Sequence, residues 1–193
     1  MAKSRKKKRK SAEKKAKRAI TLSGMHGSGK SAVGKALAEE IGFKYYSTGQ
    51  AFRDLANEKN MSLEEFTQYV ENHPEIDREL DKKIVEIAKK GDIIIDSQLS
   101  GHLLQNIENF KIMLKCPLET RVKRMADRDH TSYEEKLKET MVREKSEQER
   151  FKILYDIDLE DNTIYDLILE TEHLSIEEVL NKILSVIKSK NLK

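Results

Sequence analysis

The sequence predicts an α/β fold in which a five-stranded parallel sheet carries helices on both faces. Short apolar runs rich in strand-forming residues alternate with longer segments of helical periodicity, an order typical of parallel sheets. The run 93–95 consists of three isoleucines, as expected for a central strand that is buried on both faces. The chain has 193 residues, of which 37% are apolar, which suits one α/β domain with a small appendage.

The first half of the predicted sheet begins with the strand Ala19–Ser23, which ends in a glycine-rich turn. The helix after it, Lys30–Ile41, has apolar residues at helical spacing, and Gly42 stands where a helix C-cap belongs. Residues 43–46 follow as a second strand. These segments predict a strand, a loop, a helix and a further strand at the start of the domain.

The next segment is expected to be entirely helical. Three helices are predicted there, at 51–58, 63–72 and 74–90. A capping box of Ser62 and Glu65 begins the second of them, and Pro74 suits the first turn of the third.

The rest of the chain returns to alternating strands and helices. The three remaining strands are predicted at 93–96, 111–114 and 167–169. Pro117 opens one helix after the fourth strand. Capping boxes begin two more helices: Ser132 begins a long charged helix that runs to about residue 152, and Ser175 begins the last helix.

The charge is distributed unevenly along the chain. Residues 1–18 hold eleven Lys and Arg side chains and one acidic side chain, a formal charge of +10, whereas residues 19–193 hold 26 basic and 33 acidic side chains, or −7. The first segment repels itself and lacks apolar periodicity, so it is expected to be a disordered basic tail on a globular domain of residues 19–193. The tail favours weak contact with RNA or the ribosome, and the alternative is a tail that only enhances solubility.

Composition also excludes several classes of protein. No apolar run approaches the roughly 20 residues of a membrane-spanning helix. The basic start is followed by more charge rather than by the apolar stretch of a secretory signal. The single cysteine, Cys116, allows no disulfide within the chain and is too little for a cysteine metal site. We therefore expect a cytoplasmic protein with no membrane partner. A monomer is a separate expectation, which composition does not determine.

A phosphate-binding motif follows the first predicted strand. The sequence GMHGSGKS at 24–31 fits the pattern G-x-x-x-x-G-K-[ST] between a strand and a helix. The glycines let backbone N–H groups point at phosphate oxygens, the lysine reaches the β- and γ-phosphates, and the serine hydroxyl suits Mg²⁺. The alternative is a plain glycine-rich turn. The residues predicted to bind ATP are Gly24, Met25, His26, Gly27, Ser28, Gly29, Lys30, Ser31 and Ala32. We expect the side chain of His26 to project to solvent.

Further motifs follow the loop in order. They are Tyr46-Ser47-Thr48-Gly49 with Phe52-Arg53, then Pro74-Glu75-Ile76-Asp77-Arg78-Glu79-Leu80-Asp81, then Asp96-Ser97 with Leu99 and Gly101, and a distal run of Arg121, Arg124, Arg128, Arg143-Glu144, Glu149-Arg150, Tyr155-Asp156-Ile157-Asp158, Asp161 and Ile164-Tyr165-Asp166. With these motifs the chain resembles the archaeal-type cytidylate kinases, a group of nucleoside monophosphate kinases, over about residues 19–190. The resemblance implies a P-loop kinase core, a helical segment at about 49–90 that binds the nucleoside monophosphate, and a helical lid at about 128–155.

The resemblance also implies an activity and its residues. The reaction would be phosphorylation of CMP, and of dCMP, by ATP with Mg²⁺. The catalytic residues would be Lys30, Arg128, Arg143 and Arg150. The acceptor-binding residues would be Thr48, Gly49, Arg53, Asp77, Arg78, Asp81 and Gln98. Ser31 and Asp96 would hold the metal, although a strand-end aspartate can instead cap a turn. For Arg121 and Arg124 a solvated helix face held by i,i+4 pairs is an equal alternative.

Two positions depart from the family pattern, and each replaces a charge by an amide. Position 50 is Gln where the family usually has an acid, and position 98 is Gln where it usually has Arg. The two changes are expected either to compensate for each other, to weaken the site, or to suit a different acceptor. The alternatives to a CMP kinase are therefore a kinase of another nucleoside monophosphate and a nucleotide-binding factor with little turnover, held on RNA or the ribosome by the tail.

Overall fold

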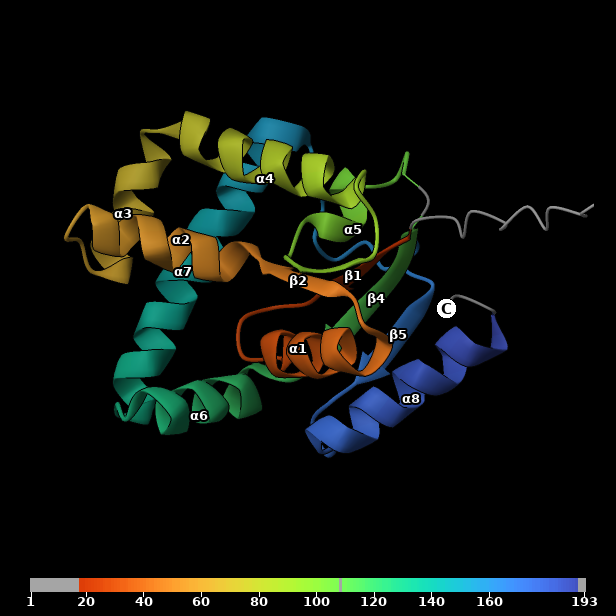
Figure 1. The fold of residues 1–193 in the computed structure, drawn as a ribbon. Coiled ribbons are helices and arrows are strands. Elements are labelled where there is room, and N and C mark those ends of the chain that lie inside the picture. The colour runs from red at the N-terminus through yellow and green to blue at the C-terminus, as the bar shows by residue number, and fades with distance from the viewer. Residues whose placement is uncertain (1–17, 108, 191–193) are drawn as a thin grey trace, which may run out of the picture.

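A sheet of five parallel strands runs through the centre of the molecule (Figure 1). The computed structural model describes residues 18–107 and 109–190, so the predicted tail lies outside the described residues except for Arg18. The strands, in the order β2-β3-β1-β4-β5 across the sheet, are β2 (Lys44–Ser47), β3 (Ile93–Asp96), β1 (Ala19–Ser23), β4 (Asn109–Lys115) and β5 (Leu167–Glu170). The five-stranded parallel sheet predicted from the sequence is confirmed.

Eight helices connect and cover the strands within the described residues. Their bounds are α1 (Lys30–Ile41), α2 (Thr48–Glu58), α3 (Leu63–Glu71), α4 (Pro74–Ala88), α5 (Ser100–Leu103), α6 (Leu118–Asp129), α7 (Tyr133–Tyr155) and α8 (Ile176–Ser189). Figure 1 shows α1 and α8 on one face of the sheet and α4 and α5 on the other, while α7 runs from α6 across to the α2–α4 group. The prediction of helices on both faces is therefore also confirmed.

Alternating side chains of the buried strands supply two hydrophobic cores. Ile20, Leu22 and Ile94 point to one face, where Leu37 of α1 and Ile183 of α8 cover them. Ala19, Ile93 and Ile95 point to the other face, where Ile84 and Ala88 of α4 and Leu104 pack. Burying both faces of the central strands explains why their sequence is almost continuously apolar.

A third cluster lies away from the sheet and holds the α2–α4 group together. Phe52 of α2 packs edge-on against Phe66 of α3, with ring centroids 4.7 Å apart. Val70 of α3 and Leu80 of α4 complete the buried cluster. The group thus has an apolar core of its own, and α7 lies against it through α3.

The predicted and observed elements differ mainly at their ends. The second helix begins at Thr48 rather than at 51, because the side chain of Ser47 accepts a hydrogen bond from the backbone N–H of Gln50 and caps it. The short helix α5 was not predicted, and β4 is longer than the predicted strand at 111–114. The capping boxes at Ser62, Ser132 and Ser175 are all present.

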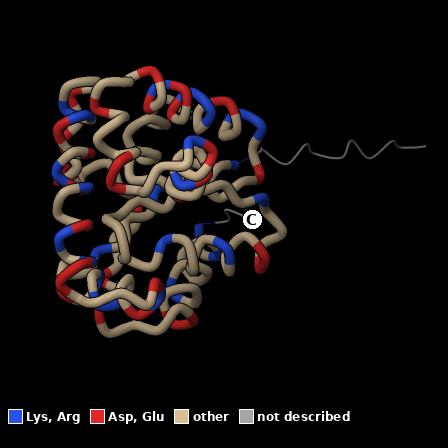
Figure 2. The backbone as a smooth tube through the Cα atoms, turned by 90° about the vertical axis from the view of Figure 1, so that its left-hand side faces the viewer, with Lys and Arg blue, Asp and Glu red and all other residues tan. Residues whose placement is uncertain are grey.

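Charge on the described globule is mixed in sign. Figure 2 shows basic and acidic residues interspersed along the helices. Within residues 18–107 and 109–190 no helix combines the length and the apolar character that crossing a bilayer requires.

Candidate active site

The carboxyl edge of the sheet opens into a cavity of about 1020 Å³. Strand register brings the ends of three strands together there, because Asp96 of β3 is level with both Leu22 of β1 and Ser47 of β2. Ligands of open parallel sheets gather at this edge. Of the residues predicted from the sequence, those that line the cavity are His26, Gly27, Ser28, Gly29, Lys30, Ser31, Ala32, Thr48, Gly49, Arg53, Asp77, Asp81, Asp96, Gln98, Arg128, Arg143 and Arg150.

The phosphate-binding loop follows β1 and depends on two glycines. Gly24 and Gly27 have φ angles of +144° and +78°. A Cβ atom would lie 2.4 Å from the carbonyl oxygen of Leu114 at the first position and 2.6 Å from that of Arg121 at the second. Only glycine therefore lets the loop fold back between β4 and α6 and deliver the N-terminus of α1 to the cavity.

Lys30, at the first position of α1, is buried in this cavity. Its Nζ atom donates a hydrogen bond to the carbonyl oxygen of Met25, at 2.9 Å. Burial lowers the pKa of Lys30, while the charge of Asp96 opposes that shift. The ammonium group is thus surrounded by its own loop, where phosphate oxygens would be attracted to it.

Asp96 is the other charged group beside the loop. Ser31 Oγ donates to Asp96 Oδ2 at 2.6 Å, and the hydroxyl of Tyr45 donates to the same oxygen at 2.7 Å. Burial, followed by the charge of Asp96 and this hydrogen bond, raises the pKa of Tyr45. A hydroxyl and a carboxylate oxygen are hard ligands of the kind that Mg²⁺ prefers.

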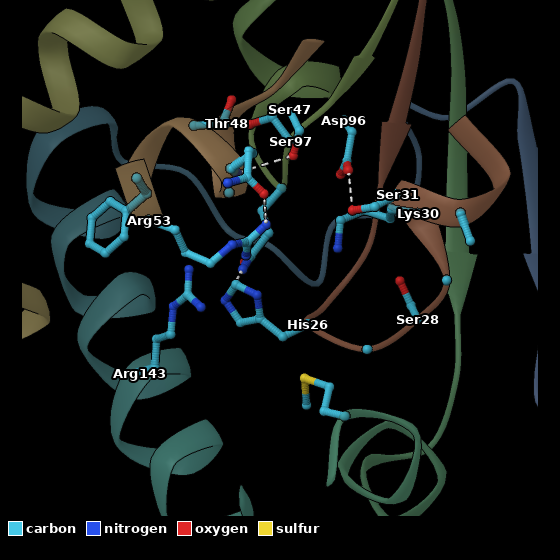
Figure 3. A pocket seen from close by; sticks show the side chains of 18 of the residues that line it. His26, Ser28, Lys30, Ser31, Ser47, Thr48, Arg53, Asp96, Ser97 and Arg143 are labelled. Atoms are coloured by element: carbon cyan, nitrogen blue, oxygen red, sulfur yellow. Dashed lines mark hydrogen bonds between the residues drawn. The ribbon is translucent and has the colours of Figure 1, made fainter. Parts of the chain in front are cut away.

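Arginines from three helices face the loop across the cavity. Arg53 of α2 donates to Gln50 Oε1 at 2.9 Å, and the guanidinium of Arg143 lies 5.4 Å from the ring centroid of Phe52. Burial and the repulsion of Arg143 and Arg128 lower the pKa of Arg53. Figure 3 shows Arg53 and Arg143 directed toward one another with His26 near them. Such an accumulation of positive charge suits phosphate oxygens.

Two buried aspartates of α4 occupy another part of the cavity wall. Asp77 Oδ2 accepts a hydrogen bond from Arg150 Nε at 2.7 Å, and burial raises the pKa of Asp77 in spite of this partner. Asp81 Oδ2 accepts from the hydroxyl of Tyr155, also at 2.7 Å. Burial raises the pKa of Asp81 to about 7. Both carboxyl groups are therefore costly to keep ionised and are placed where a polar ligand can reach them.

The prediction for the side chain of His26 is wrong. It does not project to solvent but lies against α7, where its Nε2 atom is 2.7 Å from Glu147 Oε2. Gln98 Nε2 reaches the same carboxylate oxygen at 2.6 Å, and Arg143 Nε donates to the other oxygen at 3.1 Å. Burial lowers the pKa of His26. Burial on its own would raise the pKa of Glu147, but its interactions with His26 and Arg143 hold that pKa well below the usual range.

Other predicted residues lie elsewhere. Arg78 is exposed and is not among the residues that line the main cavity, so its predicted contact with the acceptor stays a prediction, whereas Asp77 and Asp81 belong to the buried face of α4. Gly24 and Met25 line a neighbouring cavity of about 540 Å³. Arg128 does line the main cavity, but its side chain is 63% exposed and pairs with Asp129 at 2.6 Å.

The guanidinium groups of Arg121 and Arg124 of α6 are hydrogen-bonded to other parts of the protein. They are therefore not free to bind a ligand, and they do not form a solvated helix face. Arg121 pairs with Glu144 at 2.6 Å and donates to the carbonyl oxygen of His26. Arg124 lines the cavity and donates to the carbonyl oxygens of Thr171 and Glu172. Both arginines thus connect α6 to neighbouring segments.

The sequence did not point to Tyr45 or Glu147 as residues of this site, and it did not point to Tyr155 as the hydrogen-bond partner of Asp81. For Glu147 a signal was present, because it stands four residues after Arg143 on a helix, the spacing of an ion pair. No comparable local signal connects Tyr45 with Asp96, which is 51 positions away.

Comparison with known proteins identifies the group to which this arrangement belongs. A sequence model of the "cytidylate kinase-like family" matches residues 19–173. The chain belongs to the cytidylate kinase-like family. It is 44% identical over 160 residues to the cytidylate kinase of Pyrococcus horikoshii, covering 83% of each chain. The cytidylate kinase of Aeropyrum pernix is 40% identical over 171 residues, which is 89% of this chain and 99% of the relative.

Solved structures place the cytidylate kinase-like domain among P-loop kinase folds. A shikimate kinase from Acinetobacter baumannii superposes with a TM-score of 0.59 at 19% identity, over 91% of this chain and 95% of that chain. A gluconokinase from Sinorhizobium meliloti gives a TM-score of 0.53 at 14% identity, over 90% and 94% of the two chains. At this identity the likeness concerns the fold alone.

Proposed function

We propose that this protein transfers the γ-phosphoryl group of ATP to CMP, with dCMP as a second acceptor. The observation that carries the proposal is one cavity with two anion-binding halves. One half is the loop with Lys30, and the other is the group of arginines that includes Arg53 and Arg143. Family membership and the similarity to cytidylate kinases support the choice of CMP.

The donor half would bind ATP with its phosphates in the loop. Backbone N–H groups at the N-terminus of α1 and the ammonium of Lys30 supply positive charge for the β- and γ-phosphates. Apolar side chains that line the same cavity would contact the adenine ring. They are Met125 of α6, Leu174, which precedes α8, and Ile176, the first residue of α8.

The acceptor half would bind the monophosphate between α2 and α7. Arg53 offers a bidentate fork to the α-phosphate, and Thr48 and Gly49 line the cavity beside it. The cytosine ring would lie toward α4. The hydroxyl of Tyr155 donates a hydrogen bond to Asp81 Oδ2. Asp81 Oδ1 has no hydrogen-bond partner in the described part of the chain, so this oxygen could accept a hydrogen bond from the exocyclic amine of cytosine. Uracil has a carbonyl oxygen at that position, which the ionised form of Asp81, predominant above about pH 7, would repel.

Phosphoryl transfer needs little beyond positioning and charge. An α-phosphate oxygen of CMP forms a bond to the γ-phosphorus as the bond to the β–γ bridging oxygen breaks, and ADP leaves with that electron pair. Lys30 and Arg143 would stabilise charge on the moving group, and Arg128 of α6 and Arg150 of α7 would support them. Mg²⁺, which Ser31 and Asp96 would hold, neutralises phosphate charge when bound.

The test is an assay of ADP release with CMP, dCMP, UMP, AMP and GMP as acceptors. We expect the highest kcat/KM with CMP, followed by dCMP. Preference for another monophosphate would reject the acceptor, and absence of ADP release with all five would reject the enzymatic proposal in favour of a nucleotide-binding factor.

We also propose that residues 1–18 bind RNA weakly without contributing to the site. Arg18 precedes β1 at the amino end of the strands, whereas the loop and Asp96 lie at the carboxyl end. Deleting residues 2–18 should abolish RNA binding, which should otherwise weaken steeply with salt, and leave phosphoryl transfer intact. Equal RNA retention by both forms would reject this role. We also propose that the chain acts as a monomer, which a molecular-mass measurement in solution would check.

A further inference from the structure

At the tip of the phosphate-binding loop, both the backbone N–H and the backbone carbonyl oxygen of His26 are hydrogen-bonded to side chains of α6 and α7. The backbone N–H of His26 donates to Glu144 Oε1 at 3.2 Å. Its carbonyl oxygen accepts from Arg121 at 2.8 Å, and Arg121 in turn pairs with Glu144. The position of the loop tip is therefore fixed by the helices that carry the cavity arginines.

The imidazole extends this connection to Glu147. Burial lowers the pKa of His26, so the ring is neutral near pH 7 and carries one proton. With that proton on Nε2, the ring donates to Glu147 Oε2 at 2.7 Å. The amide of Gln98 donates to the same oxygen at 2.6 Å, which explains why the two nitrogens of His26 and Gln98 lie only 2.9 Å apart.

The other oxygen of Glu147 sets the direction of Arg143. Glu147 Oε1 accepts from Arg143 Nε at 3.1 Å. The two terminal nitrogens of Arg143 have no hydrogen-bond partner in residues 18–107 and 109–190, and Figure 3 shows the guanidinium directed into the cavity near Arg53. Both Arg143 and Glu147 are less than 10% exposed, so water does not compete for their contact.

We propose that His26 is a positioning residue that holds Glu147 so that Arg143 presents its terminal nitrogens to the transferring phosphoryl group. Loss of the imidazole N–H would leave Glu147 Oε2 short of one donor inside a buried site. Carboxylates satisfy such a deficit by forming a bidentate pair with arginine. The carboxylate would then turn toward a second nitrogen of Arg143 and withdraw it from the phosphates.

Removing the imidazole of His26 should lower kcat, whereas damage to the loop itself would also raise the KM for ATP. The loop amides and Lys30 would still bind ATP, so His26→Ala should lower kcat roughly tenfold to a hundredfold and change the KM for ATP less than threefold. His26→Gln keeps an N–H donor and should restore most of kcat. His26→Phe fills the ring volume without a donor and should behave like His26→Ala, which covers the case in which the alanine variant does not fold.

The decisive experiment is a double-mutant cycle between His26→Phe and Arg143→Ala. If His26 acts through Arg143, the His26 change should lower kcat at most twofold further in the Arg143→Ala background. Multiplicative effects on kcat, or a large rise in the KM for ATP, would overturn the proposal and assign His26 to loop structure. Thermal unfolding of each variant shows whether the fold is retained.

Because the inference rests on the proposed phosphoryl transfer, the same cycle is also measured without turnover. Calorimetry gives the dissociation constant of ADP with aluminium fluoride, which mimics the transferring phosphoryl group, in the presence of CMP for each variant. Coupling between positions 26 and 143 in that constant, with no ADP release by the wild-type chain, would reject the proposed function and retain the positioning role. Independent effects in this binding cycle would overturn the positioning role.

Discussion

The buried carboxyl of Asp81 should make the stability of the fold depend on pH. Burial is the largest cause that raises its pKa to about 7 from an ordinary value of 3.8. The folded protein therefore keeps this proton up to about pH 7, whereas the unfolded chain releases it above about pH 4. Asp81 contributes stability in full below about pH 4, and that contribution is lost as the pH rises through 7.

The magnitude follows from the two pKa values. One pKa unit corresponds to about 1.4 kcal/mol, so complete ionisation of Asp81 lowers the free energy of unfolding by about 4 kcal/mol. About 3 kcal/mol of this falls between pH 5 and pH 8, because the unfolded chain is already ionised in part at pH 5. Asp81→Asn removes the titration and retains an oxygen that can accept the hydrogen bond from Tyr155.

The assay is urea and thermal unfolding of the wild-type chain and Asp81→Asn at pH 5 and pH 8. Relative to wild type, the variant should gain about 3 kcal/mol between these pH values, or about 6–12 °C in Tm for a domain of this size. Asp127→Asn, at an exposed position of α6, is the matched control and should follow wild type at both pH values. An equal stability difference between Asp81→Asn and wild type at pH 5 and pH 8 would refute the reasoning.

Three further predictions concern the loop and its neighbours. Lys30→Ala should lower kcat at least a hundredfold while circular dichroism and Tm stay close to wild type, because the ammonium acts on charge that develops during transfer; near-full activity would contradict the phosphoryl-transfer role. Tyr45→Phe removes one of two donors to Asp96 and should raise the Mg²⁺ concentration for half-maximal activity about fivefold, measured by Mg²⁺ titration; an unchanged titration would separate Tyr45 from the metal site. Gly34→Ala would place a Cβ atom 2.8 Å from the Tyr45 ring and should cost about 1–3 kcal/mol of stability, and a variant with wild-type unfolding would show that the ring moves freely.

Local chemistry explains which parts of the structure the sequence could predict. The capping box at Ser132 and the glycines of the loop act within a few residues, so their patterns alone locate the start of α7 and the turn after β1. The contact of His26 with Glu147 joins positions 121 residues apart and depends on how α7 packs against the loop. No local pattern carries that information, whereas the place of His26 at a variable position of the loop predicts a side chain in solvent.

The exposure of Arg78 differs from the contact of His26, because a local signal was present for it. Asp77 and Asp81 share a helical phase with Ile84 and Ala88, which face the core, so the buried side of α4 could be read from the chain. Arg78 stands about 100° away from Asp77 around that helix. A motif match alone does not distinguish between adjacent residues of a helix, whereas its apolar phase does.

The uninterrupted length of α7 mechanically connects the residues that it contributes to the cavity. Its 23 residues correspond to about 35 Å of helix, and hydrogen-bonded caps at Ser132 and Asp156 define both ends. One rigid rod therefore carries Arg143, which faces the loop, and Arg150, which pairs with Asp77 of α4 at 2.7 Å. A rotation of only 10° about one end displaces the other by about 6 Å, more than any hydrogen bond can span. Because both arginines belong to this one helix, a tilt of α7 would move the contacts of Arg143 and Arg150 together rather than one at a time.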